Sequence, residues 1–202
     1  MGYVDRALYK AVNRLAGRTA WAHGLLRLTA KDGIAAFGLL LLIGWWIGRT
    51  SAAPIPAVAR AVWAGAGALL ALAINQPIGA AIARARPYAV IPGVHLLVDK
   101  TTDFSFASDH ATAAGAVAAG LFLVDRRLGI VASLAALAMA FARVYVGAHY
   151  PGDVVAGLAL GAAITLASYR PAARLLEPLL AALAKTPLRP VIVAGRAPAS
   201  AR

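Results

Sequence analysis

Three short polar patches interrupt a chain that is otherwise largely apolar. Arg86 and Arg143 carry planar guanidinium groups, which suit the paired oxygens of a phosphate. His110 and His149 supply two imidazoles, which can divide the roles of nucleophile and general acid. This combination predicts phosphoryl transfer through a histidine, a reaction that needs no metal ion. The patches are residues 84–87, 107–110 and 143–153.

Two further features of the patches favour an anion site. Asp153 lies four residues after His149, so one helical turn can bring its carboxylate to a ring nitrogen and set the tautomer. Ser108 and Asp109 open an apolar run, and a helix that begins there offers free backbone N–H groups to phosphate. Ionisable groups at membrane depth are costly, so their gathering in these patches indicates a functional site.

The composition places these patches in a membrane protein. Hydrophobic residues make up 61% of the 202 residues and charged residues 14%, whereas soluble domains have about 45–50% and about 25%. So few charges cannot cover the surface of a small soluble domain. The net charge of +12 is scattered among the apolar runs, so we expect membrane lipid and no nucleic acid as a partner. The chain has no cysteine, which excludes disulfides and thiolate metal sites.

The apolar runs predict an all-α bundle of five to six membrane spans. Residues 1–32 carry Leu8 and Leu15 on one face and cations elsewhere, which predicts an amphipathic helix on the membrane surface. Residues 33–170 form the predicted catalytic domain, and residues 171–202 form a basic tail with one short helical stretch. The five runs are 33–48, 61–83, 106–124, 128–146 and 154–169.

The loops between the runs predict an orientation. Five spans place the 84–105 loop and the 147–152 loop on one side of the membrane, and Arg49, Arg126 and Arg127 on the other. Short loops rich in Arg and Lys stay in the cytoplasm, so we expect the second side and the C-terminus to be cytoplasmic. The site is then expected on the outer face of a bacterial cell membrane. The sequence leaves the oligomeric state undetermined.

In order along the chain, the patches resemble the three motifs of the type 2 phosphatidic acid phosphatase (PAP2) superfamily, K-x6-R-P, P-S-G-H and S-R-x5-H-x3-D. Residues 75–169 carry the resemblance, and the S-D-H variant is similar to the bacterial undecaprenyl-diphosphatase branch. It implies an integral-membrane phosphatase that acts on a lipid phosphate or diphosphate without a cofactor. The motifs stand here as Gly79-x6-Arg86-Pro87, Ala107-Ser108-Asp109-His110 and Ala142-Arg143-x5-His149-x3-Asp153.

The resemblance implies a role for each matching residue. His149 would be the nucleophile that forms a phosphohistidine, and Asp153 would orient and stabilise it. His110 would protonate the leaving group and then activate water. The implied substrate is a polyprenyl diphosphate, with phosphatidate or phosphatidylglycerophosphate as the alternative. The phosphate would be held by Arg86, Arg143, Ser108 and the backbone around Asp109.

One departure from the motifs leaves a second class of function open. The lysine of the first motif is Gly79 here, which two helical turns would place on the same face as Arg86. Arg84 could substitute as a phosphate ligand if the helix unwinds before Pro87, and Lys100 in the following loop is another candidate. Without a substitute, the chain would be a non-catalytic protein that binds phospholipid headgroups.

Overall fold

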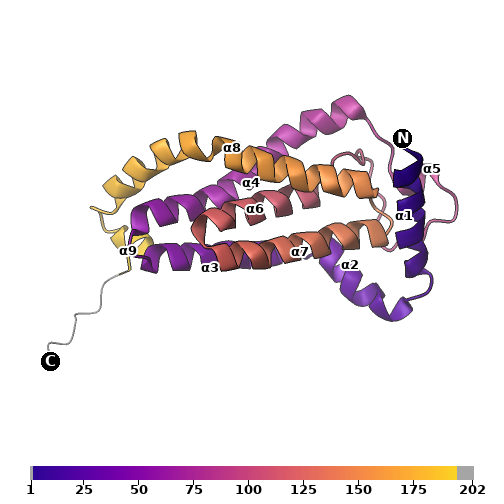
Figure 1. The fold of residues 1–202 in the computed structure, drawn as a ribbon, viewed down its shortest axis with the longest axis horizontal. Coiled ribbons are helices and arrows are strands. Elements are labelled where there is room, and N and C mark those ends of the chain that lie inside the picture. The colour runs from indigo at the N-terminus through magenta and orange to yellow at the C-terminus, as the bar shows by residue number, and fades with distance from the viewer. Residues whose placement is uncertain (1, 195–202) are drawn as a thin grey trace.

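The computed structural model describes residues 2–194, and every regular element in this range is helical (Figure 1). The long helices are α3 (Ile34–Thr50), α4 (Pro54–Ile82), α6 (Asp109–Val124), α7 (Arg126–Tyr145) and α8 (Pro151–Leu183). The shorter elements are α1 (Tyr3–Ala16), a 3-10 turn (Ala20–Ala22), α2 (His23–Lys31), α5 (Pro87–Val90) and α9 (Arg189–Ile192). Each predicted apolar run forms one long helix, which confirms the all-α bundle. Residues 195–202 of the predicted tail lie outside the described range.

The long helices are suited to a membrane. Three segments, Pro54–Val90, Arg126–Tyr145 and Pro151–Leu183, are long and apolar enough to cross one. The apolar helices α3 and α6 are shorter, with 17 and 16 residues, and tilt or local thinning of the bilayer can absorb such a difference. The chain is therefore an integral membrane protein.

The last long helix extends beyond its predicted end. We expected the fifth apolar run to stop near residue 169, whereas α8 continues through Pro171 to Leu183. A proline inside a helix removes one backbone hydrogen bond, and membrane helices tolerate this loss. The predicted boundary at residue 170 therefore lies inside a continuous helix.

Helix α6 occupies the centre of the bundle and packs against α4, α7 and α8. Its buried residues are mostly alanine and glycine, which let neighbouring backbones approach closely. A Cβ atom added at Gly115 would lie 2.3 Å from the carbonyl oxygen of Leu158, and one at Gly161 would lie 2.0 Å from that of Thr112. This close packing holds the first turns of α6 and α8 side by side, at the end where two of the polar patches lie.

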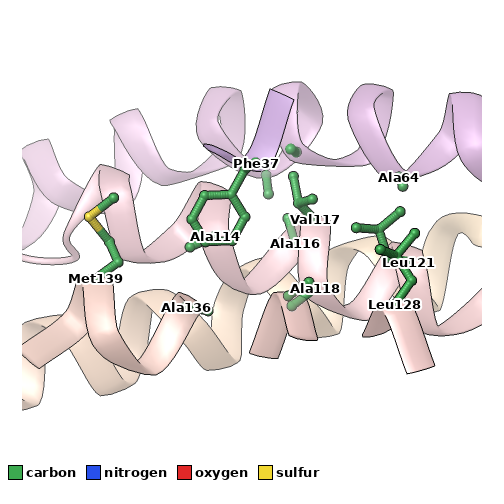
Figure 2. Close-up of a cluster of buried hydrophobic side chains, with 13 residues drawn as sticks. Phe37, Ala64, Ala114, Ala116, Val117, Ala118, Leu121, Leu128, Ala136 and Met139 are labelled. Carbon is green, nitrogen blue, oxygen red and sulfur yellow. The ribbon is translucent and has the colours of Figure 1, made fainter. Parts of the chain in front are cut away.

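The largest hydrophobic cluster joins α3, α4, α6 and α7 (Figure 2). Phe37 from α3 is its bulkiest member, Met139 extends it from α7, and Val117 and Leu121 of α6 lie between the surrounding helices. Alanines fill most of the rest, so the helices sit close together with little space for rearrangement. The cluster therefore provides a rigid support for the polar end of the bundle.

The N-terminal helix α1 lies across the end of the bundle (Figure 1). Asn13 on its inner face is buried, and its Nδ2 donates to the carbonyl oxygens of His95 at 2.9 Å and Tyr145 at 3.0 Å. Leu8 and Leu15 remain 52% and 43% exposed. The apolar outer face that they form is the face that the predicted surface helix would present to the membrane.

Candidate active site

A cavity of about 230 Å³ gathers residues from all three polar patches. Five residues of the predicted site line it together: Arg86, Asp109, His110, Arg143 and His149. Three others, Arg84, Ser108 and Asp153, do not line it. Among residues 2–194, no group of three or more His, Asp or Glu side chains is arranged to hold a metal ion. The other lining residues are Lys31, Tyr88, Val98, Asp99, Thr101, Asp103 and Ala148.

His149 lies in the tight turn between α7 and α8 and is only 2% exposed. The turn requires Gly147, whose φ of +87° is a left-handed conformation that other residues disfavour. The backbone N–H groups of Ala148 and His149 donate to the carbonyl oxygen of Arg143 at 3.1 and 3.3 Å. The turn therefore folds back onto the end of α7 and brings the imidazole beside Arg143.

The hydrogen bonds of the His149 imidazole define its tautomer. Nδ1 lies 2.8 Å from the carbonyl oxygen of Ser105, which can only accept, so Nδ1 carries the proton of the neutral ring. Nε2 then accepts from Nη1 of Arg86 at 3.1 Å and from Nη2 of Arg143 at 3.2 Å. Burial, reinforced by the charges of Arg143 and Arg86, holds the pKa of His149 well below its usual value. The ring is therefore neutral near pH 7, and its unprotonated Nε2 faces two guanidinium groups.

Backbone carbonyl groups hold both guanidinium groups in place. Nη1 of Arg86 donates to Ala148 at 3.1 Å, and Nη1 of Arg143 donates to Ala30, in the last turn of α2, at 2.9 Å. Arg86 also donates through Nη2 to Oδ2 of Asp103 at 2.9 Å. Nε of Arg143 is buried and finds no acceptor among the described residues.

The carboxylate of Asp153 does not make the predicted hydrogen bond to His149. Its Oδ2 lies 3.9 Å from Nδ1 of His149, beyond hydrogen-bond distance. Oδ2 instead accepts from Oγ of Ser105 at 2.5 Å and from the backbone N–H of Tyr150 at 3.0 Å. Oδ1 accepts from Nη1 of Arg84 at 2.5 Å. Because Ser105 also supplies the carbonyl that binds the imidazole, Asp153 is connected to His149 through Ser105.

Helix α4 ends between Gly79 and Arg86, so the two residues do not lie on one helix. The helix ends at Ile82, and Ala83 adopts a left-handed conformation with a φ of +49°. The expectation that Gly79 and Arg86 share one helical face is therefore wrong. The helix does unwind before Pro87, the condition under which Arg84 could have replaced the lysine, but the unwinding does not bring Arg84 into the cavity wall.

The side chain of Arg84 connects α1 to the start of α8. Its guanidinium group forms an ion pair with Asp5 of α1 in addition to the pair with Asp153. The same group lies 4.0 Å from the ring centre of Tyr150, and Oδ1 of Asp5 accepts from the backbone N–H of Gly152 at 2.8 Å. The amphipathic N-terminal segment is thus linked to the Asp153 carboxylate through Arg84.

The first turn of α6 places His110 in the wall of the cavity, beside His149. The neighbouring Asp109 is held from α4, because its Oδ1 accepts from Nδ2 of Asn75 at 2.7 Å and from Nε2 of Gln76 at 3.0 Å. The Ser108 hydroxyl is buried outside the cavity wall and has no hydrogen-bond partner among the described residues. A role for Ser108 in holding phosphate stays a prediction.

Four residues of this arrangement were not anticipated from the sequence. Asp5 carried a weak signal, since it is an isolated acid among the cations of the N-terminal segment. Ser105 and Asp103 lie just before the second patch, but nothing in their spacing indicates a partner. Lys31 carried no signal, because it reaches the cavity only through the packing of α2 against α7.

Comparisons with known proteins find relatives in sequence and in fold. The sequence model of the PAP2 superfamily matches residues 60–175, more than half of the chain. The undecaprenyl-diphosphatase BcrC of Bacillus subtilis is 29% identical over 163 residues, which are 81% of this chain and 81% of the relative. The decaprenylphosphoryl-5-phosphoribose phosphatase of Mycobacterium tuberculosis is 36% identical over 140 residues, 68% of this chain and 76% of the relative. The crystal structure of a PAP2-type phosphatidylglycerolphosphate phosphatase from Bacillus subtilis has a similar fold, with a TM-score of 0.57. The two sequences are 24% identical, and the match covers 81% of this chain and 82% of that one.

Proposed function

Because the chain belongs to the PAP2 superfamily, we propose that this membrane lipid-phosphate phosphatase cleaves a polyprenyl diphosphate through a phosphorylated His149. One observation carries the proposal: the unprotonated Nε2 of His149 faces Arg86 and Arg143 in a cavity shared with His110. The names of two relatives support the substrate class, since both refer to a polyprenyl lipid that carries phosphate.

The first chemical step is attack by Nε2 of His149. Oxygens of the terminal phosphate replace Nε2 as acceptors for Arg86 and Arg143, which frees its lone pair and neutralises the phosphate charge. Nε2 then bonds to the terminal phosphorus, and the bond from that phosphorus to the bridging oxygen breaks. The electron pair stays on the bridging oxygen, which His110 protonates as the polyprenyl monophosphate leaves.

The second step returns the enzyme to its starting state. His110, now deprotonated, takes a proton from water, and the water oxygen attacks the phosphorus. The nitrogen–phosphorus bond breaks, its electron pair returns to Nε2, and inorganic phosphate leaves. During the life of the intermediate the His149 ring is positively charged, and the Ser105 carbonyl and the nearby Asp153 carboxylate stabilise that charge.

Phosphate release from a panel of lipids tests the proposed function. The full chain in detergent with EDTA should release phosphate from undecaprenyl diphosphate faster than from phosphatidate or phosphatidylglycerophosphate. His149→Ala should abolish release and the acid-labile phosphoprotein. His23→Gln is the matched control and should leave both unchanged, because His23 lies outside the cavity wall, where its ring contacts the Ala16 carbonyl and the edge of Tyr145. Headgroup binding without release from any lipid would favour the non-catalytic alternative.

We place the site on the outer face of the membrane and the C-terminus in the cytoplasm. The site and the last helix, α9, lie at opposite ends of the bundle (Figure 1), and the chain has no cysteine to interfere with labelling. In intact cells, Thr102→Cys should react with a membrane-impermeant maleimide, and Thr186→Cys should react only after lysis. Both positions are exposed, and both substitutions preserve charge. The reverse labelling pattern would contradict this orientation.

A further inference from the structure

The cavity contains a third cation that the motif residues do not explain. Arg86 and Arg143 both contact Nε2 of His149, so both serve the phosphate under attack. Lys31 also lines the cavity, although it is the last residue of α2 and belongs to the amphipathic N-terminal segment. Its place in the cavity wall brings the end of α2 next to the space where a lipid phosphate would bind.

The structure accounts for the absence of the motif lysine at Gly79. A Cβ atom added there would lie 2.8 Å from the backbone carbonyl oxygen of Phe106, so the space in which a side chain would begin is already occupied. The two substitutes considered from the sequence are also not available to the substrate. Arg84 is committed to Asp5 and Asp153, and Lys100 is not a lining residue of the cavity.

Lys31 is held near the catalytic residues but its ammonium group remains free to move. The carbonyl of the preceding residue, Ala30, accepts the 2.9 Å hydrogen bond from Arg143. The backbone next to Lys31 is therefore hydrogen-bonded to the guanidinium group of Arg143, which also contacts His149. In contrast, Nζ makes only a long, 3.4 Å contact with Asp99, and the Lys31 side chain is 63% exposed. Such an exposed pair contributes little, so a bound phosphate can draw the ammonium group away from Asp99.

We propose that Lys31 takes the place of the motif lysine and binds the phosphate next to the lipid chain, which makes the enzyme selective for diphosphates over monophosphates. This assignment rests on the proposed function. Arg86 and Arg143 hold the terminal phosphate, and Lys31 stabilises the negative charge that appears on the second phosphate when the bridging bond breaks. A monophosphate has no second phosphate for Lys31 to bind.

Kinetics with two substrates that differ by one phosphate test this role. Lys31→Met should lower kcat/KM for farnesyl diphosphate at least about tenfold and change kcat/KM for farnesyl monophosphate by less than about twofold. Lys31→Arg should restore most of the diphosphate activity, because it restores the charge. Lys10→Met, which removes an exposed lysine of α1 outside the cavity, is the matched control and should leave both substrates unaffected. An equal effect of Lys31→Met on both substrates, or none, would overturn the proposal.

A binding measurement separates this proposal from the proposed function. In the His149→Asn protein, calorimetry should show that Lys31→Met weakens binding of pyrophosphate about tenfold and leaves orthophosphate binding nearly unchanged. If the wild-type enzyme hydrolyses only monophosphates but retains this preference for pyrophosphate, the proposed function fails and the role of Lys31 stands. If the enzyme hydrolyses diphosphates but Lys31→Met changes neither binding nor selectivity, the role of Lys31 fails and the proposed function stands.

Discussion

Asp153 and His149 lie 3.9 Å apart and are joined through Ser105, without a direct hydrogen bond. The backbone carbonyl of Ser105 binds Nδ1 of the imidazole, and its hydroxyl group binds the carboxylate. The carboxylate is therefore close enough to stabilise the positive charge that the ring would carry in the proposed phosphohistidine, while the Ser105 carbonyl sets the tautomer. Ser105 therefore positions both the imidazole of His149 and the carboxylate of Asp153.

Removal of the Ser105 hydroxyl should slow catalysis without preventing it. Ser105→Ala leaves the carbonyl bond to His149 intact but takes a donor from the buried Asp153, so we expect kcat to fall about tenfold with little change in KM. The rate at which the phosphoprotein forms in a single turnover measures the effect. Ser168→Ala loses only a hydrogen bond within α8 and serves as control. A fall as large as that of His149→Ala would mean that the hydroxyl group has a direct chemical role.

Arg84 should support catalysis and stability from outside the cavity. Arg84→Met leaves the Asp153 carboxylate buried without its charged partner and removes one of the contacts that hold α1, so we expect a lower melting temperature and a lower kcat with a nearly unchanged KM. The exposed Arg14 of α1 supplies a control, Arg14→Met, that should change neither quantity. If Arg84→Met instead raised KM alone, Arg84 would be a ligand of the substrate phosphate.

The protonation of His149 should begin only at acidic pH. Its pKa is lowered first by burial and then by Arg143 and Arg86, so the folded protein stays unprotonated at this site while the unfolded chain binds a proton near pH 6.5. Between these two pKa values the unfolded state holds more protons, and the free energy of unfolding should fall as the pH drops.

A ¹³C-NMR titration of ring-labelled histidine in detergent measures this pKa directly. The chain has only four histidines, so the spectrum of His149→Asn identifies the signal of His149 by its absence. That signal should not titrate near pH 6.5. A midpoint at or above that pH would contradict the neutral nucleophile.

A lysine introduced at position 79, where the family motif has one, should not increase activity. Gly79→Lys and Gly79→Ala both place a Cβ atom 2.8 Å from the Phe106 carbonyl oxygen, so both should lower the melting temperature and neither should raise kcat/KM. Gly65→Ala lies on the same helix, where the added Cβ atom meets only the Leu41 side chain at 3.6 Å, and should be tolerated. Higher activity of Gly79→Lys would show that the loop at Phe106 yields and that the cavity lacks a cation.

Much of the architecture follows from patterns that are local in the sequence. Continuous apolar runs predict membrane helices wherever they occur, and all five became helices. The spacing from Arg143 to His149 is short enough for one turn to bring the two residues together, as the structure shows. The resemblance to the PAP2 superfamily rests on the same short motifs, and the match over residues 60–175 confirms it.

Only the tertiary structure decided which residues partner the catalytic groups. Asp153 is near His149 in sequence, yet its partners include Arg84, 69 residues away, and Ser105, 48 residues away. A carboxylate binds the donors that packing brings within reach, and that packing depends on where α4 ends and on how α6 and α8 meet. The placement of Lys31 depends likewise on α2 docking against α7. The sequence by itself thus determined the chemical groups and their helices, whereas long-range packing determined which cations line the cavity and which one, Arg84, lies outside it and binds Asp5 and Asp153.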